Sequence, residues 1–283
     1  MRTQKNRPIG VFDSGIGGLS VVKEVQRVLP EESIIYFGDT ARLPYGTKSK
    51  ETIIRFSREI VRFLLKFRVK LIVVACHTAS SFSLPTLKRE LDLPVIGVVQ
   101  PGAEEALRLT RTGRIGVLGT RATVQSESYV KALQKYHVGA GIKVFSKACP
   151  LFVPLVEEGH LHDDLAYRVA EKYLLPLKRL RVDTVILGCT HYPLLRGVIG
   201  DVLGAKTVLV DSSHQTAAQV KQLLERENLI ASNGWSRPAS QFYVSDEPNR
   251  FSKVGSIFLR HRIRPVKKIC IPSPGSGGIS CIA

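Results

Sequence analysis

Residues 71–80 read LIVVACHTAS, in which four consecutive aliphatic residues are followed by alanine, a cysteine and a polar run. Such an unbroken aliphatic run is typical of a parallel strand that is buried on both faces. Residues 184–193 read TVILGCTHYP and repeat the order of strand, small residue, cysteine and threonine. Open parallel sheets bind ligands just beyond the carboxyl ends of their strands. The two stretches therefore predict two similar α/β units that each contribute one cysteine to a shared cleft.

Further short apolar runs flank these two stretches. They cover residues 9–12, 33–37, 95–98, 114–118 and 207–210. Amphipathic helical patterns lie between them, most clearly over residues 50–67, where apolar side chains occupy one face and Arg and Lys the other. This alternation predicts an α/β fold with parallel sheets.

The composition narrows the class of protein. The 283 residues are 44% hydrophobic and 23% charged, which is typical of globular proteins and excludes a collagen-like or disordered chain. No apolar run approaches the ~20 residues that span a bilayer, and no signal peptide is expected. The five cysteines form no C-x-x-C pair. We therefore expect a cytoplasmic protein with reduced thiols and no membrane partner.

The charge is strongly positive and unevenly placed. Lys and Arg number 41 against 24 Asp and Glu, which gives a formal net charge of +17. From Asn249 onward there are seven basic residues and no acidic one. Such a tail is compatible either with a polyanion partner or with a basic, solvated surface. Residues 271–283, rich in Pro, Gly and Ser, are expected to be dispensable for folding and catalysis.

Two other strand ends carry polar, glycine-rich loops, at residues 13–18 (DSGIGG) and 38–46 (GDTARLPYG). The first does not complete a dinucleotide-binding fingerprint, because Ser20 stands where the last glycine belongs. The backbone N–H groups of such a turn can instead hold a carboxylate. No Walker A motif, Schiff-base lysine motif or metal-ligand cluster follows a predicted strand. We therefore expect neither a cofactor nor a metal.

The two strand-end cysteines invite a chemical interpretation. A single cysteine after a strand is usually a small buried hydrophobic residue. Cys76 and Cys189 occur in matched contexts, however, and His191 follows the second of them closely. A helix N-terminus, a cation or a base would activate either thiol. We interpret both as reactive and the other three cysteines as structural.

The polar motifs also occur together in a recognisable order. The series comprises FDSGIGGLS at 12–20, DTARLPYG at 39–46, ACHTAS at 75–80, PLVE at 154–157 and GCTHYP at 188–193. It resembles the glutamate racemases, cofactor-independent amino-acid racemases with two catalytic cysteines, and the resemblance runs from Pro8 to Arg262. It implies an isomerase that supplies D-glutamate for peptidoglycan. It also implies two α/β domains around the active site, here residues 1–98 plus 211–283 and residues 99–210.

Racemisation without a cofactor would require both thiols. An amino-acid Cα–H is a very weak acid, so inversion without a cofactor needs a base on one face and an acid on the other. By resemblance, Cys76 deprotonates the D-isomer and Cys189 the L-isomer. A cysteine with the ordinary pKa of ~8.5 is mostly protonated at neutral pH and needs a polar helper. Asp13 is the candidate for Cys76, and His191 with Glu157 for Cys189, although Asp13 alone is equally well explained as a helix cap and Glu157 as a solvated loop residue.

The resemblance also implies which residues bind the substrate, glutamate. Hydroxyl groups would bind its amino and α-carboxylate groups: Ser14, Thr78 and Thr190. One turn would bind its side-chain carboxylate: Pro44, Tyr45 and Gly46. Two further threonines join this set: Thr120 and Thr123. The sequence leaves a homodimer open.

His77 departs from the pattern of the resembled family, which has asparagine directly after the first cysteine. Residues 211–215 (DSSHQ) depart from it as well. An imidazolium at His77 would attract a substrate carboxylate and help to ionise Cys76, so we expect the charged form. An acid-side feature of the pH profile should then disappear in His77→Asn. The alternative is that His77 turns away from the cleft and packs.

The departure at His77 also keeps two other functions open. One is racemisation of another acidic amino acid, such as aspartate, by the same two thiols. The other is a weakly active relative whose basic tail binds nucleic acid or a protein.

Overall fold

The computed structural model describes residues 4–137, 141–232 and 239–271. Its strands form two parallel sheets, which confirms the predicted α/β class. The first sheet has the order β10-β9-β2-β1-β3-β4, with β1 (Ile9–Asp13), β2 (Ile34–Gly38), β3 (Leu71–Val74), β4 (Val95–Gly97), β9 (Gln241–Val244) and β10 (Val266–Lys268). The second has the order β6-β5-β7-β8, with β5 (Arg114–Gly119), β6 (Lys143–Ala148), β7 (Thr184–Gly188) and β8 (Val208–Val210).

Helices link the strands and cover the sheets. They are α1 (Leu19–Val28), α2 (Lys50–Leu65), α3 (His77–Glu90), α4 (Val99–Leu109), α5 (Arg121–Gln125), α6 (Ser128–Tyr136), α7 (Phe152–Glu158), α8 (Asp164–Arg179), α9 (Arg196–Leu203), α10 (Ser212–Arg226) and α11 (Pro248–Leu259). Short 3-10 turns lie at Gln4–Asn6, Thr40–Arg42, Tyr45–Thr47 and Tyr192–Leu195. No helix of the described residues is long and apolar enough to cross a membrane.

The central strands are buried along their whole length, as their unbroken aliphatic runs predict. Every residue of β1, β2, β3 and β7 is buried. The aliphatic pattern does not mark β6, β9 and β10. In β6 no residue is fully buried, since four are partly buried and two are exposed. Edge strands of this kind are held by pairing with a neighbour rather than by burial on both faces.

The pairing register brings the strand ends together. Phe12 of β1 pairs with Val74 of β3, so the residues that follow each strand emerge side by side. In the second sheet, Gly119 of β5 pairs in the same way with Gly188 of β7. The loops that carry the polar motifs therefore leave adjacent strands at one edge of each sheet.

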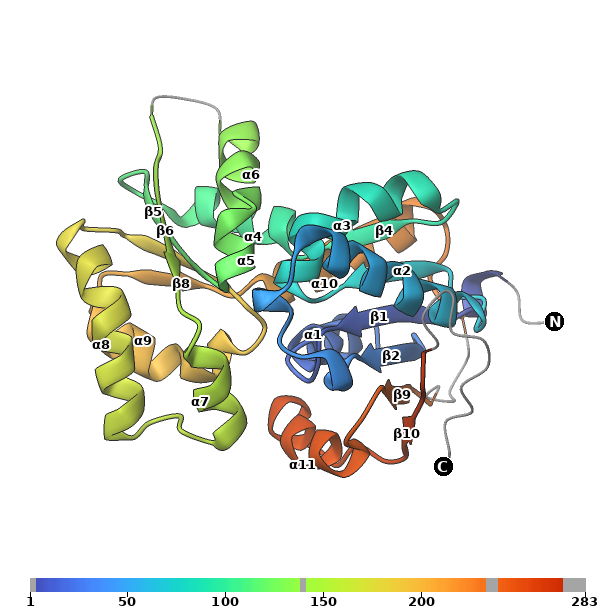
Figure 1. The fold of residues 1–283 in the computed structure, drawn as a ribbon. Helices are drawn as coiled ribbons and strands as arrows, with labels where there is room; N and C mark the ends of the chain where they lie inside the picture. Colours follow the sequence, from blue (N-terminus) through green and yellow to red (C-terminus); the bar gives the residue numbers. More distant parts are fainter. Residues whose placement is uncertain (1–3, 138–140, 233–238, 272–283) are drawn as a thin grey trace.

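Two helices connect the sheets. Figure 1 shows the first and second sheets as separate layers, with α4 and α10 between them. Helix α10 packs against both α1 and α4, and α4 also packs against α6 and β7. The first sheet uses strands from residues 9–97 and 241–268, and the second uses strands from residues 114–210. The predicted domain division at residues 98 and 210 stays a prediction, and the tail 272–283 lies outside the described residues.

Candidate active site

Cys76 lies where β3 gives way to α3. It is the N-cap residue of α3, and its Sγ accepts a hydrogen bond from the Ala79 N–H at 3.4 Å. Its S–H donates to the Ser14 hydroxyl at 3.6 Å, beyond the end of β1. The amide groups of a helix N-terminus stabilise a thiolate. The fold thus places this thiol where negative charge can be accommodated when it forms.

Asp13 is completely buried close to this thiol. Its Oδ2 accepts a hydrogen bond from the Gly15 N–H at 3.0 Å, while Oδ1 has no hydrogen-bond partner among the described residues. Burial raises the pKa of Asp13. Burial, together with the charge of Asp13, raises the pKa of Cys76 to about 12. In the unliganded site Cys76 is therefore a thiol, which is the form that can donate a proton.

Cys189 has a different neighbourhood. Its Sγ lies 3.9 Å from Nδ1 of His191, and Nε2 of His191 lies 3.2 Å from Oε1 of Glu157. Burial disfavours a charge on His191, but hydrogen bonds with Cys189 and Glu157 outweigh it and raise the pKa of His191 to about 10. His191 is therefore an imidazolium at neutral pH. This cation lies where it can balance a negative charge on the sulfur of Cys189.

The two thiols belong to one site. A Cβ on Gly17 would lie 2.2 Å from Oγ1 of Thr190, so the turn after β1 approaches the loop after β7 too closely for any side chain. The charge of Cys189 contributes to the raised pKa of Cys76, and the charge of His191 acts on Asp13. The structure thus brings the predicted catalytic residues of both sheets together.

Three threonines form a second contact between the loops of the two sheets. Oγ1 of Thr78 on α3 lies 2.9 Å from Oγ1 of Thr120 and 3.1 Å from Oγ1 of Thr123, which are themselves 3.0 Å apart. Thr120 is the N-cap residue of α5 and accepts from the Thr123 N–H. A ring of hydroxyl groups that can donate or accept suits a carboxylate or ammonium ligand.

The turn at 44–46 faces this ring. A Cβ on Gly46 would lie 2.5 Å from Cβ of Thr120, so the backbone of this turn lies directly against Thr120 and leaves no room for a side chain. Tyr45 is buried, and its hydroxyl donates to Oδ2 of Asp39. A contact of Tyr45 with a substrate would therefore have to come from its backbone.

A cavity of about 300 Å³ opens between the two sheets. Four residues of the predicted set line it: Pro44, Gly46, Thr120 and Glu157. Arg121 and Arg250 line it as well, and the Arg250 guanidinium lies 3.0 Å from Oε1 of Glu158 and 3.8 Å from Oε2 of Glu157. Sequence reasoning missed both arginines, because neither stands in a motif and Arg250 is one of many basic residues near the C-terminus. Among the described residues, no group of three or more His, Cys, Asp or Glu side chains is placed to hold a metal ion.

The expectation of a charged His77 is wrong. Its side chain is buried, with Nδ1 2.7 Å from the Tyr129 hydroxyl and Nε2 3.3 Å from Oγ of Ser212. Burial without a compensating charge lowers the pKa of His77 to about 3. Both ring nitrogens are thus taken by hydroxyl groups on α6 and α10, and the imidazole is neutral at physiological pH. The alternative in which His77 packs is the one that the structure supports.

A neutral, buried His77 should make folding sensitive to acid. In the unfolded chain the imidazole titrates near its ordinary pKa of ~6.5, so between that pH and about 3 the unfolded state binds more protons. The free energy of unfolding then falls as the pH drops below ~6.5, by up to about 1.4 kcal/mol per pH unit from this group. We expect His77→Asn to show a smaller loss between neutral pH and pH ~5 in urea unfolding. An equal loss in both proteins would contradict this assignment.

The comparisons with known proteins agree with this geometry. The family model described as Asp/Glu/Hydantoin racemase matches residues 9–220. The glutamate racemase of Geobacter metallireducens is 46% identical over 270 residues, which cover 94% of this chain and 97% of that relative. The structure of a Bacillus anthracis glutamate racemase isoform is similar with a TM-score of 0.89 and 39% identity, covering 95% of this chain and 99% of that one.

A further solved structure was determined with a ligand. The Francisella tularensis glutamate racemase, in complex with D-glutamate, matches with a TM-score of 0.88 and 38% identity over 95% of this chain and 99% of that one. With two thiols from two parallel sheets in one site and relatives that match over almost the whole chain, the protein belongs to the Asp/Glu/hydantoin racemase family, and its relatives named above are glutamate racemases.

Proposed function

We propose that the protein interconverts L- and D-glutamate by proton transfer at Cα between Cys189 and Cys76. The observation that carries this proposal is the unequal support of the two thiols. Cys189 lies beside the His191 imidazolium, which can balance a negative charge there, whereas burial and Asp13 raise the pKa of Cys76 to about 12. One group is thus prepared to accept a proton and the other to donate one.

The proposed reaction from L-glutamate begins with the Cys189 thiolate. It removes the Cα proton, and the electron pair left on Cα is delocalised into the α-carboxylate. The Cys76 thiol then gives its proton to the opposite face and becomes a thiolate, while Cys189 is left as a thiol. This protonation state is the one that D-glutamate requires, so the reverse reaction starts from it.

The substrate contacts remain part of the proposal. The Ser14 hydroxyl lies within hydrogen-bond distance of Cys76. The hydroxyls of Thr78, Thr120 and Thr123 contact one another between the two sheets. Thr190 is buried against Gly17 at the Cys189 side. We assign the α-carboxylate and amino groups to these hydroxyls, and the side-chain carboxylate to the backbone at 45–46 beside the cavity.

The proposed mechanism requires no cofactor, because the two thiols supply both the base and the acid. We place the reaction in the cytoplasm and assign its product, D-glutamate, to peptidoglycan synthesis. A homodimer stays a prediction.

The proposal is tested with purified protein by following the formation of D-glutamate from L-glutamate, with the conversion of aspartate measured in parallel. We expect glutamate to be racemised with undiminished rate after dialysis against a chelator; racemisation of aspartate alone would contradict the assignment.

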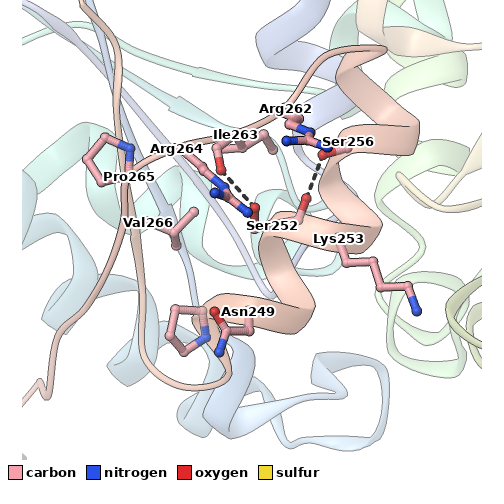
Figure 2. Close-up of a pocket in the computed structure, with 10 residues that line it drawn as sticks. Asn249, Ser252, Lys253, Ser256, Arg262, Ile263, Arg264, Pro265 and Val266 are labelled. Atoms are coloured by element: carbon pink, nitrogen blue, oxygen red, sulfur yellow. Dashed lines mark hydrogen bonds between the residues drawn. The ribbon is translucent and has the colours of Figure 1, made fainter.

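The basic C-terminal region supports a second proposal, binding of a nucleic acid. Figure 2 shows a cavity between α11 and residues 262–266, with Arg262 and Arg264 reaching toward Ser256 and Ser252 of the helix. Its volume is about 820 Å³, and its lining contains Lys253, Arg262 and Arg264 but no acidic residue. Such a surface neutralises phosphates without reading sequence.

Retention of a single-stranded oligonucleotide should therefore weaken steeply with added salt. Alanine at Lys253, Arg262 and Arg264 together should reduce it several-fold, whereas alanine at three exposed basic residues of α8, Arg168, Lys172 and Arg179, should not. Equal binding by the two variants would show a general charge effect and refute a site at α11.

A further inference from the structure

The residues next to the two thiols meet through one side chain. His77 follows Cys76 directly and is the first residue of α3, and its Nδ1 lies 2.7 Å from the Tyr129 hydroxyl. The Tyr129 ring in turn packs on Gly188, which directly precedes Cys189. A Cβ placed on Gly188 would lie 3.2 Å from Cε2 of Tyr129. A continuous path of contacts thus runs from one cysteine to the other through Tyr129.

The second ring nitrogen of His77 is also hydrogen-bonded. Nε2 of His77 lies 3.3 Å from Oγ of Ser212, the first residue of α10. The side chains of His77, Tyr129 and Ser212 are all buried. The rings of His77 and Tyr129 are stacked, with centroids 6.0 Å apart and planes inclined by 27°. A neutral imidazole has one donor and one acceptor nitrogen, and each hydroxyl can serve either. A neutral His77 therefore forms both hydrogen bonds of this bridge, one as donor and one as acceptor.

The bridge differs from the other contacts that cross between α3 and the second sheet. The ring of Thr78, Thr120 and Thr123 lies at the proposed substrate site, where its hydroxyls are assigned to the substrate. The hydroxyls of Ser81 and Ser128, 2.7 Å apart, join α3 to α6 farther along the helix. Of these three contacts, the one at His77 is made by the residue adjacent to a thiol.

We propose that Tyr129, held by His77 and Ser212, is the spacer that sets the position of Cys76 relative to Cys189. This inference rests on the proposed two-thiol reaction. Proton transfer on opposite faces of one carbon tolerates little error in the position of either group, and a misplacement of ~1 Å can cost a rate factor of about 10². His77 and Tyr129 are thus positioning residues, which do not touch the substrate.

The variants His77→Phe and Tyr129→Phe each keep a ring but remove the hydrogen bond between them. The segment that carries Cys76 then loses this link to Tyr129, although Cys76 keeps its bonds with Ser14 and Ala79, whereas Cys189 retains His191 and Glu157. We expect kcat to fall about 10-fold in each variant with KM changed less than about 2-fold, and the double variant to be no slower than the slower single one.

Deuterium at Cα identifies which step is slowed. When Cys76 is misplaced, the isotope effect should rise with the isomer whose proton Cys76 removes, because that cleavage becomes more rate-limiting. It should fall with the other isomer, because reprotonation by Cys76 then limits the reaction. A variant that simply contains less folded protein changes neither value. Ser57→Ala is the matched control, since it removes a buried hydrogen bond to α3, Ser57 to Ser83 at 2.8 Å, away from the bridge.

The outcomes separate the inference from the proposed function. If the parent protein does not racemise glutamate, the proposed function fails. If the parent is active and both isotope effects in His77→Phe equal those of the parent, the spacer is refuted. Should His77→Phe not fold, Ser212→Ala removes a single bond of the bridge and is measured in the same way, with the same divergence expected in smaller degree.

Discussion

Replacing either Cys76 or Cys189 with alanine should reduce racemisation by at least about 10³-fold, toward the upper end of what one acid or base group contributes. Each thiol handles the proton on its own face of Cα, so neither can substitute for the other. Turnover of L- and D-glutamate is followed in both directions by a chiral assay. Because neither sulfur is assigned as a binding anchor, glutamate should still protect both variants against thermal unfolding.

Cys149→Ala is the control for this prediction. Cys149 is also a buried free thiol, but its S–H donates to the Lys147 carbonyl at 3.6 Å, and it follows β6, which β5 separates from the strand before Cys189. Its activity should match the parent protein. A Cys189→Ala variant that still racemises glutamate would refute the two-thiol mechanism.

Glu157→Gln should have the second-largest effect, a loss of about 10- to 100-fold in kcat, since a hydrogen bond to a charged group contributes ~1.5–3 kcal/mol. Glu157 is the carboxylate that, with Cys189, keeps His191 charged against the cost of burial. Without it the pKa of His191 falls. The imidazolium that is retained up to a pH of about 10 in the parent protein is then lost at lower pH. The basic limb of the pH profile should shift to lower pH accordingly.

Glu158→Gln is the matched control. Glu158 lies next in the chain and forms an exposed pair with Arg250 at 3.0 Å, and exposed pairs contribute at most ~1 kcal/mol. Its pH profile should be that of the parent protein. If Glu157→Gln and Glu158→Gln gave the same profile, Glu157 would have no specific influence on His191.

The strand ends illustrate what sequence reasoning reaches. The runs before Cys76 and Cys189 predict buried strands, and parallel pairing then brings their loops to one edge of each sheet. The placement of His191 follows from the same logic, because it stands directly after β7. The approach of Glu157 to His191 does not, because Glu157 lies on α7, which follows the unpredicted strand β6. Weakly apolar strands such as β6 escape prediction, because their stability comes from a neighbour that the local sequence does not show.

His77 illustrates where sequence reasoning ends. Its position after a reactive cysteine suggests a side chain in the cleft, and its ordinary pKa suggests a partly charged ring. The protonation state depends instead on Tyr129 and Ser212, which lie far along the chain and meet the ring only after both sheets are assembled. The placement of Arg250 beside Glu157 has the same cause, since α11 and α7 are brought together only in the folded protein.

The most direct test of the central claim, transfer between two separate thiols, is racemisation of L-glutamate in D₂O analysed at low conversion. Cys189 removes the Cα proton while Cys76 delivers a solvent-derived deuteron to the other face. We predict that the D-glutamate formed carries one deuterium at Cα and that the remaining L-glutamate carries none. D-glutamate that retains the original proton, or L-glutamate that acquires deuterium as fast as product forms, would contradict the two-thiol account.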